Sequence, residues 1–127
     1  MTALATQKSK KGAQAYHAGL AAEASVTRDY SDRGYTVAAQ RWRGLSGEID
    51  LIVRHQNAVV FVEIKHSRNF ERAIASLGKP QMQRIYAAAE EFIGSEPDGA
   101  LTNVRFDVAL VDGAGRIKIL ENAFGLG

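Results

Sequence analysis

The chain has 127 residues, of which 46% are hydrophobic and 24% are charged; this suffices for one domain with a core and is too short for two. It has no cysteine, which excludes disulfides, thiolate metal sites and cysteine nucleophiles. No apolar run reaches the roughly 18 residues of a membrane helix, and the first residues lack the apolar core of a signal peptide. We therefore expect a cytoplasmic protein with no membrane partner.

The net charge of +2 is unevenly distributed along the chain. Residues 1–72 carry 11 Lys and Arg against 7 Asp and Glu, whereas residues 73–127 carry 5 against 7. A local excess of basic residues is typical of proteins that bind a polyanion such as DNA. A solvated charged surface explains the charge distribution equally well.

The first half of the chain predicts a helix followed by strands. Residues 1–11 are interpreted as a mobile basic tail, and residues 12–127 as a single domain. Residues 12–33 place apolar side chains at spacings of three and four, which predicts a helix that ends at Gly34. Three segments rich in β-branched or aromatic residues then predict strands: "YTVAAQRWR", "EIDLIVR" and "AVVFVEIK".

The second half predicts two helices and two more strands. "RNFERAIASL" is compatible with a short helix, and "PQMQRIYAAAEEFIG" predicts a longer helix with Pro80 in its first turn. After the loop "SEPDGA", the segments "VRFDVALV" and "RIKIL" predict strands around the turn "DGAG". This order of elements predicts an α/β fold, a single domain in which helices flank a mixed central β-sheet.

The two strands around residue 56 predict a hairpin with a definite register. A turn at residues 56–57 pairs residues whose numbers sum to 113, so Asp50 faces Glu63 and Glu48 faces Lys65. Because side chains alternate across a strand, one face becomes aliphatic and the other collects these four charges. A slip of one residue would place charge on the aliphatic face, so the pattern favours this register.

The opposed acids predict a metal site. Carboxylates on directly opposed residues repel unless a cation or a proton lies between them. Mg²⁺ and Mn²⁺ prefer oxygen ligands, which Asp50, Glu63 and the backbone carbonyl of Ile64 would supply. Lys65 would orient a water molecule or stabilise the charge on a phosphate in the transition state. The alternative is a set of cross-strand ion pairs on a solvated face.

Several segments taken in order resemble a known family. "GLAAE", "GYTVAAQRWR", "GEIDLI", "FVEIK", "QRIYAAAEEF" and "RFDVALV" are similar to the YraN-like uncharacterised bacterial family. That family looks like a branch of the PD-(D/E)xK nuclease superfamily, near the Holliday-junction resolvases. The resemblance implies a restriction-endonuclease-like fold and Mg²⁺- or Mn²⁺-dependent hydrolysis of DNA, with branched or structured DNA as the expected substrate.

The resemblance also implies roles for individual residues. Asp50, Glu63 and Lys65 match the acid–acid–lysine motif of the superfamily. Glu23 matches a helical glutamate that assists metal binding in resolvase-like members. Gln81 stands where the family often has a lysine early in the second long helix. These matches complete a predicted catalytic set of Asp50, Glu63, Lys65, Glu23 and Gln81, with metal ligands from Asp50, Glu63, Ile64 and Glu23.

Other side chains are candidates for nucleic-acid binding. Arg41 and Arg43 would bind phosphates and Trp42 would stack on a base. In the alternative interpretation, Trp42 packs in the core and the arginines are solvated. The set also includes His66 and Arg68, which follow the motif lysine; Arg68 lies one position after the basic residue of many relatives. Its last member is Lys79, an offset substitute for the lysine that the family often has early in the second long helix.

The expected function is therefore a metal-dependent endonuclease. The alternatives are a nucleic-acid-binding module without catalysis and a protein-interaction adaptor. A two-fold homodimer would suit a four-way junction, although no sequence feature specifies one. Arg105 with Asp107 is interpreted as a possible structural pair, and Glu90 with Glu91 as a solvated helix face.

Overall fold

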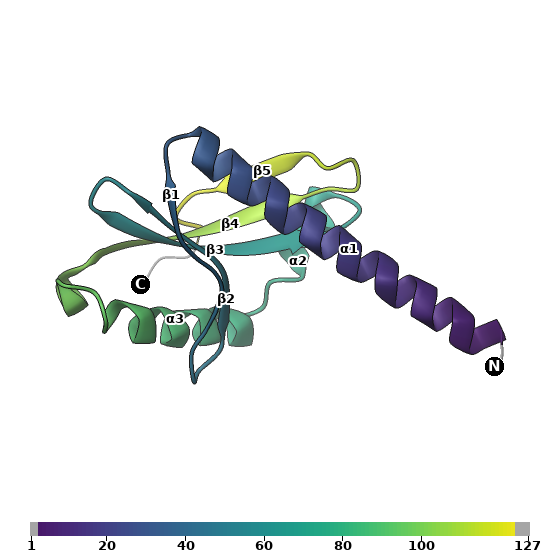
Figure 1. Ribbon diagram of the computed structural model, residues 1–127, viewed down its shortest axis with the longest axis horizontal. Coiled ribbons are helices and arrows are strands. Elements are labelled where there is room, and N and C mark those ends of the chain that lie inside the picture. Colours follow the sequence, from purple (N-terminus) through teal and green to yellow (C-terminus); the bar gives the residue numbers. More distant parts are fainter. Residues whose placement is uncertain (1–2, 124–127) are drawn as a thin grey trace.

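A five-stranded sheet forms the centre of the computed structural model, and helices cover both of its faces (Figure 1). The structure describes the backbone of residues 3–123 and the side chains of residues 16–123. The elements are α1 (Ala3–Asp32), β1 (Thr36–Arg43), β2 (Glu48–His55), β3 (Ala58–His66), α2 (Phe70–Ala75), α3 (Lys79–Ile93), the short 3₁₀ helix η1 (Gly99–Leu101), β4 (Asn103–Val111) and β5 (Ile117–Leu120). No helix in this part of the chain is long and apolar enough to cross a lipid bilayer.

The strands follow their sequence order across the sheet, from β1 to β5. Only β3 and β4 run parallel to each other, and the other neighbours are antiparallel. A parallel pair needs a crossover connection, which α2, α3 and η1 provide. The predicted single α/β domain with a mixed sheet is confirmed, and the architecture is consistent with a restriction-endonuclease-like fold.

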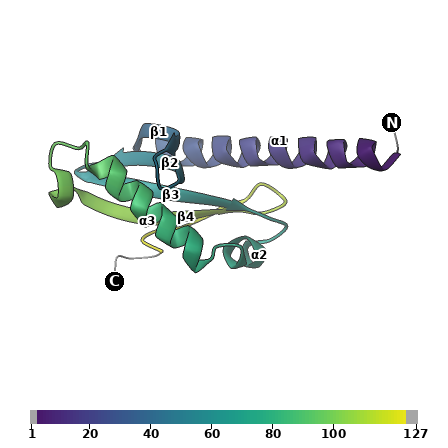
Figure 2. The ribbon, with the colours of Figure 1, turned by 90° about the horizontal axis from the view of Figure 1, so that it is seen from below.

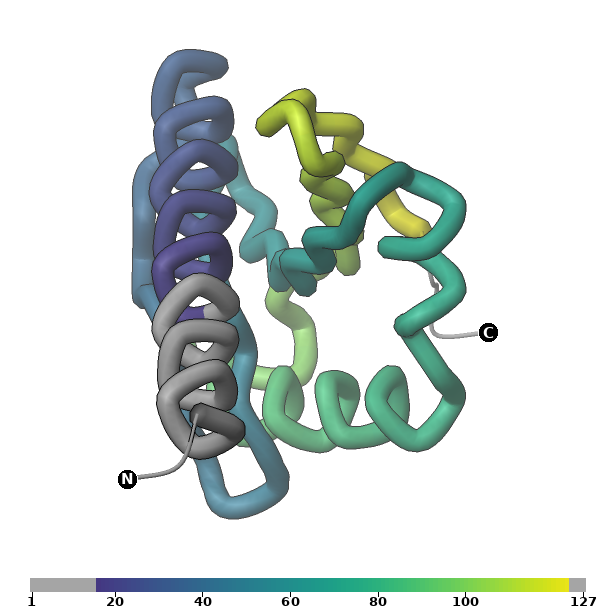
Figure 3. Tube along the Cα trace, turned by 90° about the vertical axis from the view of Figure 1, so that its right-hand side faces the viewer, coloured from purple at the N-terminus to yellow at the C-terminus, as the bar shows by residue number. Residues whose placement is uncertain are grey.

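Each face of the sheet is buried beneath a different helix. Figure 2 shows α1 on one side of the strands and α3 on the other, and Figure 3 shows α1 and α3 at two sides of the molecule. On the α1 side, Val26 and Tyr30 pack against residues such as Leu51 and Val62. On the α3 side, the core consists of Ile49, Ile52, Val59, Phe61, Ile85, Ala88, Ala89 and Phe106.

The first helix begins earlier in the chain than the sequence predicts. α1 starts at Ala3 rather than at residue 12, so the backbone of residues 3–11 is helical, within the segment 1–11 that is predicted as a tail. The side chains of residues 1–15 lie outside the described part, and the mobility of the tail stays a prediction. The end of the helix is as predicted, because Gly34 has a φ of 91°, a left-handed conformation that glycine adopts without strain.

The predicted hairpin register is confirmed near the turn and not beyond it. Observed pairs run from His55–Ala58 to Leu51–Val62. The predicted pairing of Asp50 with Glu63 is not among them. The backbone N–H of Ile64 instead donates a hydrogen bond of 2.8 Å to the Asp50 carboxylate.

The predicted division into an aliphatic and a charged face is wrong in two respects. Ile49 packs under α3, whereas Leu51 packs under α1, so β2 changes face between them. The residue between them is Asp50, and the residue opposite Asp50 in β1 is Arg41. The φ of 49° at Arg41 interrupts the regular strand geometry. Furthermore, Ile52 and Phe61 fill the face predicted to be charged, since a helix covers each side of the sheet.

Candidate metal centre

Acidic and polar side chains from β2, β3 and α3 meet in one small pocket. Its volume is about 270 Å³, and it is lined by Glu48, Asp50, Glu63, Gln81, Arg84 and Ile85. β2 and β3 carry the acids, and the first turns of α3 bring the other three residues over them. The pocket thus brings together three residues of the predicted catalytic set: Asp50, Glu63 and Gln81.

Glu63 is a buried acid that contacts one amide and one ammonium group. Its side chain is 6% exposed, and Oε1 accepts a hydrogen bond of 2.8 Å from Nε2 of Gln81. The nearest ammonium group is that of Lys65, with Nζ 3.7 Å from the same oxygen. Burial, followed by repulsion from Asp50, raises the pKa of Glu63 to about 8, although Lys65 opposes this shift.

Asp50 is half-buried and interacts directly with Glu63. Burial raises the pKa of Asp50, while hydrogen bonds from the Ile64 N–H and from Glu63 oppose this increase. A carboxyl group can donate such a hydrogen bond only when it is protonated. Burial and mutual repulsion therefore both favour the protonated form of this pair, and a bound cation would compete with that proton.

The ion pair predicted between Glu48 and Lys65 does not form. Glu48 instead pairs with Arg43, its backbone neighbour in β1, at 3.2 Å. Lys65 lies close to Glu63 on the α3 side of β3. The cross-strand alternative for Lys65 therefore fails, and the motif lysine stays next to the acid pair.

Glu23 forms an ion pair with Arg41. Their side chains approach to 2.8 Å, and the hydrogen bond to Glu23 raises the pKa of Arg41. Glu23 also contributes to the repulsion that raises the pKa of Asp50, which places the α1 glutamate near the pocket. Two residues predicted for different roles, metal ligation and phosphate binding, thus contact each other.

Trp42 packs in the core, as the alternative interpretation predicts. Its ring meets the edge of Phe92 at a centroid distance of 5.6 Å and is partly buried. Arg43, the next residue, is largely exposed despite its contact with Glu48. Both arginines of the "RWR" segment are exposed, Arg43 more than Arg41.

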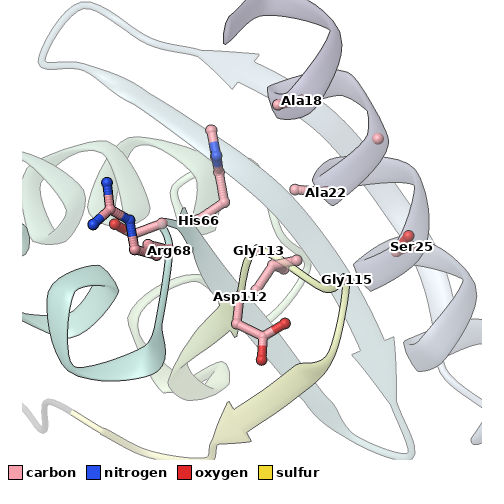
Figure 4. Close-up of a pocket in the computed structure, with 11 residues that line it drawn as sticks. Ala18, Ala22, Ser25, His66, Arg68, Asp112, Gly113 and Gly115 are labelled. Carbon is pink, nitrogen blue, oxygen red and sulfur yellow. The ribbon is translucent and has the colours of Figure 1, made fainter. Parts of the chain in front are cut away.

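A second cavity, of about 370 Å³, lies between α1 and the segment that follows β3 (Figure 4). His66 and Arg68, both exposed, lie across it from the small α1 residues Ala18, Ala22 and Ser25. Lys79, also exposed, begins α3. The predicted nucleic-acid-binding residues are therefore spread over several surfaces, and none of them lines the acid pocket.

Arg84 is the residue of the pocket that the sequence analysis missed. It is exposed and lies three residues after Gln81 on α3. Residues three apart lie on the same face of a helix, so the position of Gln81 could have identified Arg84. A guanidinium group at the mouth of an acidic pocket is suited to bind a phosphate of an approaching substrate.

A separate buried acid occupies the α1 side of the sheet. Asp107 is fully buried and accepts hydrogen bonds from Tyr30 at 2.8 Å, from Arg105 at 2.8 and 2.9 Å, and from the Asn122 N–H at 3.0 Å. The interpretation of Arg105 and Asp107 as a structural pair agrees with this geometry.

The fold and the pocket together are consistent with the PD-(D/E)xK class. A mixed α/β domain places Asp50, Glu63 and Lys65 of the motif beside Gln81 of the following helix. Among the described side chains, no group of three or more His, Cys, Asp or Glu residues is arranged to hold a metal. The candidate centre therefore depends on two carboxylates.

Comparison with known proteins identifies the family. The uncharacterised protein family UPF0102 matches residues 22–111, and the chain belongs to this family. It is 61% identical to a UPF0102 protein of Ruegeria pomeroyi over 92% of this chain and 95% of the relative. It is 58% identical to one of Roseobacter denitrificans, over 91% and 90% of the two chains.

Proposed function

We propose that the protein is a Mg²⁺- or Mn²⁺-dependent endonuclease that hydrolyses DNA phosphodiester bonds. The observation that carries this proposal is the buried pair of Asp50 and Glu63, which has Lys65 beside it. A structural acid such as Asp107 has both of its oxygens bound by a guanidinium group, whereas two buried acids here share one ammonium group, with Nζ of Lys65 3.7 Å from Glu63. A pKa of about 8 at Glu63 indicates a site where a cation would lower the free energy.

The donors present fit a hard divalent cation. Two carboxylates are too few protein ligands for a closed zinc site, but Mg²⁺ commonly binds one or two carboxylates and keeps several waters. Asp50 and Glu63 would hold the ion, with the Ile64 carbonyl and Glu23 as further candidate ligands. A bound ion would polarise the phosphoryl oxygen and lower the pKa of an attacking water.

The protein residues would position the groups that react. The Ile64 N–H orients Asp50, and Gln81 orients Glu63. Lys65 would stabilise the negative charge that develops at phosphorus, while Arg84 binds a neighbouring phosphate. The water oxygen would lose a proton to solvent as it forms a bond to phosphorus, and the bond from phosphorus to the leaving oxygen would break as that oxygen takes up a proton from solvent.

Two observations favour a second candidate, a nucleic-acid-binding module without catalysis. Glu23, the expected accessory ligand, is paired with Arg41, and Gln81 stands where a lysine is expected from the family resemblance. Under this alternative the acid pair would bind a cation that bridges to a DNA phosphate without cleaving it.

The test is incubation of the protein with labelled linear, single-stranded and four-way DNA in Mg²⁺ or Mn²⁺. The matched control is the double variant Asp50→Asn with Glu63→Gln, which keeps the shape of the pocket. We expect cleavage of at least one DNA form by the wild-type protein alone, and an increase in its melting temperature with Mn²⁺ that the double variant lacks. DNA binding without cleavage would support the binding module. An equal increase in both proteins would reject the metal site.

We further propose DNA as the partner, the cytoplasm as the location, and a homodimer as the form that would act on a four-way junction. DNA affinity should decrease steeply with salt because phosphate contacts release counterions. Failure to bind DNA at low salt would favour the adaptor alternative.

A further inference from the structure

The turn between β1 and β2 carries a fully exposed leucine. This turn, residues 44–47, has the sequence Gly-Leu-Ser-Gly, and no part of the Leu45 side chain is covered by the protein. Single exposed leucines are common on protein surfaces. Leu45 differs from an ordinary exposed side chain because the backbone on both sides of it is fixed.

Glu91 of α3 holds the turn in place. Its carboxylate accepts hydrogen bonds from the N–H of Leu45 at 2.8 Å and of Ser46 at 2.7 Å. Hydrogen bonds from the side chain and backbone of Ser46 and from the backbone of Leu45 lower the pKa of Glu91. The interpretation of Glu91 as part of a solvated helix face agrees with its partial exposure, and in addition the carboxylate anchors the turn.

The glycines of the turn allow this close contact. The Gly44 N–H donates a hydrogen bond of 2.9 Å to the carbonyl of Gly47 and closes the turn. A Cβ atom on Gly44 would lie 2.4 Å from a carboxylate oxygen of Glu91, too close for any other residue without a shift. The backbone of the turn is thus closely packed against Glu91, whereas the side chain of Leu45 is fully exposed.

The turn lies next to the acid pocket. A Cβ atom on Gly47 would lie 3.5 Å from Cβ of Arg84, which lines the pocket together with Glu48. Arg43, at the other end of the turn, is largely exposed. Gly47 is the end of the turn that meets the pocket, whereas Leu45 is fixed by Glu91, seven residues beyond Arg84 on α3. Leu45 is therefore an exposed apolar tip on the same hairpin as the pocket residue Glu48.

We propose that Leu45 is a wedge that inserts between neighbouring bases of DNA bound at the acid pocket, while Arg43 and Arg84 contact the adjacent phosphates. This inference rests on the proposed function. Leucine is among the apolar residues that DNA-bending proteins insert between base steps. Insertion requires less energy where stacking is already weak, so the wedge would select mismatched or branched DNA over fully paired duplex.

The experiment measures base unstacking with 2-aminopurine placed at successive positions of a mismatched duplex. Ca²⁺ replaces Mg²⁺, because it takes the same oxygen ligands. Binding of the wild-type protein should increase the fluorescence several-fold at one position. Leu45→Ala should remove this increase and weaken binding to the mismatched duplex about tenfold, as expected for lost apolar burial, with little effect on fully paired DNA.

Two variants serve as controls. Leu101→Ala removes another leucine, 87% exposed on η1 and outside the acid pocket, and should leave fluorescence and affinity unchanged. Glu91→Ala releases the turn but keeps Leu45, and should reduce the fluorescence increase because the wedge is no longer positioned. Unchanged melting temperatures for Leu45→Ala and Leu101→Ala would show that both variants are folded.

The possible outcomes separate the inference from the proposed function. If the wild-type protein binds and cleaves DNA but produces no increase at any position, or if Leu45→Ala retains the increase, the wedge is rejected and the nuclease proposal stands. If the wild-type protein binds no DNA, both are rejected. Self-association that Leu45→Ala abolishes would assign the leucine to a contact between copies and would likewise reject the wedge.

Discussion

Asp107 and Glu63 are both buried acids, yet their surroundings differ completely. Asp107 lies on the α1 side of the sheet and accepts hydrogen bonds from Tyr30, Arg105 and the backbone of Asn122. Glu63 lies on the α3 side, where it interacts with Gln81, with Asp50 and, at 3.7 Å, with the ammonium group of Lys65. One acid has a guanidinium bound to both of its oxygens, and the other has a second acid beside it.

This difference separates a structural acid from a candidate functional one. A buried charge that is paired and hydrogen-bonded holds the fold together, and its partners have no freedom to act on a substrate. A buried acid that faces another acid raises the free energy of the folded protein and lowers it again when a cation binds. Variants of the two sites should therefore change different observables.

The largest effect is expected from Asp107→Ala. Removing this acid leaves the guanidinium of Arg105 and the hydroxyl of Tyr30 without their buried partner. The free energy of unfolding should decrease by about 3–5 kcal/mol, as measured by urea denaturation. Mn²⁺ should still increase the melting temperature of any folded variant. Loss of the Mn²⁺ effect without loss of stability would place Asp107 in the functional class.

Lys65→Ala should act on the cleavage rate and not on the fold. In the proposed mechanism, Lys65 stabilises charge that develops only in the transition state, and the loss of one such group lowers the rate about 100- to 1,000-fold. Single-turnover cleavage at saturating Mn²⁺ measures this step, and the increase in melting temperature with Mn²⁺ should persist. Equal rates for the two proteins would exclude a catalytic role for the lysine.

Glu63→Gln should stabilise the metal-free protein at high pH. The folded protein holds the proton of Glu63 up to a pH of about 8, whereas the unfolded chain releases it near the ordinary value of 4.5. Stability therefore decreases as the pH rises between these two values, and the variant lacks this decrease. Its gain at pH 8 should be on the order of 2 to 4 kcal/mol relative to pH 4. A parallel pH dependence of both proteins in urea denaturation would contradict the raised pKa.

The smallest effect is expected from Gln81→Ala, which removes the hydrogen bond that orients Glu63. Supporting residues of this kind typically change metal affinity about 10- to 100-fold, and a single amide should lie at the lower end of this range. Titration with Mn²⁺, followed by calorimetry, would measure the change. Gln81→Lys tests the residue expected from the family resemblance; an affinity equal to that of the wild-type protein in both variants would remove Gln81 from the site.

The sequence was sufficient to predict the elements and the turn of the central hairpin. Local spacing determines both, since β-branched residues on either side of residues 56–57 leave few alternative pairings. The sequence was insufficient where the alternation of side chains along a strand is interrupted. Ile49 packs under α3 because β1 and β2 both change face at Arg41 and Asp50. No feature of the residues next to Arg41 predicts its left-handed backbone conformation.

Within the site, the motif residues were predictable and their partners were not. The spacing of Asp50, Glu63 and Lys65 along two paired strands is a local property. The ion pair between Glu23 and Arg41 joins α1 to β1 and depends on how the helix lies over the sheet. Contacts of this kind cannot be read from separate motifs, which is why the two residues received independent roles.

The parallel pairing of β3 with β4 has a consequence for the kinetics of folding. β2 and β3 are joined by a two-residue turn, whereas residues 67–102 separate β3 from β4, so the hairpin can form long before the crossover closes. Glu63 becomes buried only when α3, which belongs to this crossover, has packed over the hairpin. Its unfavourable ionisation should therefore affect a late step, after the main barrier to folding. Raising the pH from 5 to 8 should then accelerate unfolding more than it slows folding, a difference that stopped-flow measurements in urea would resolve.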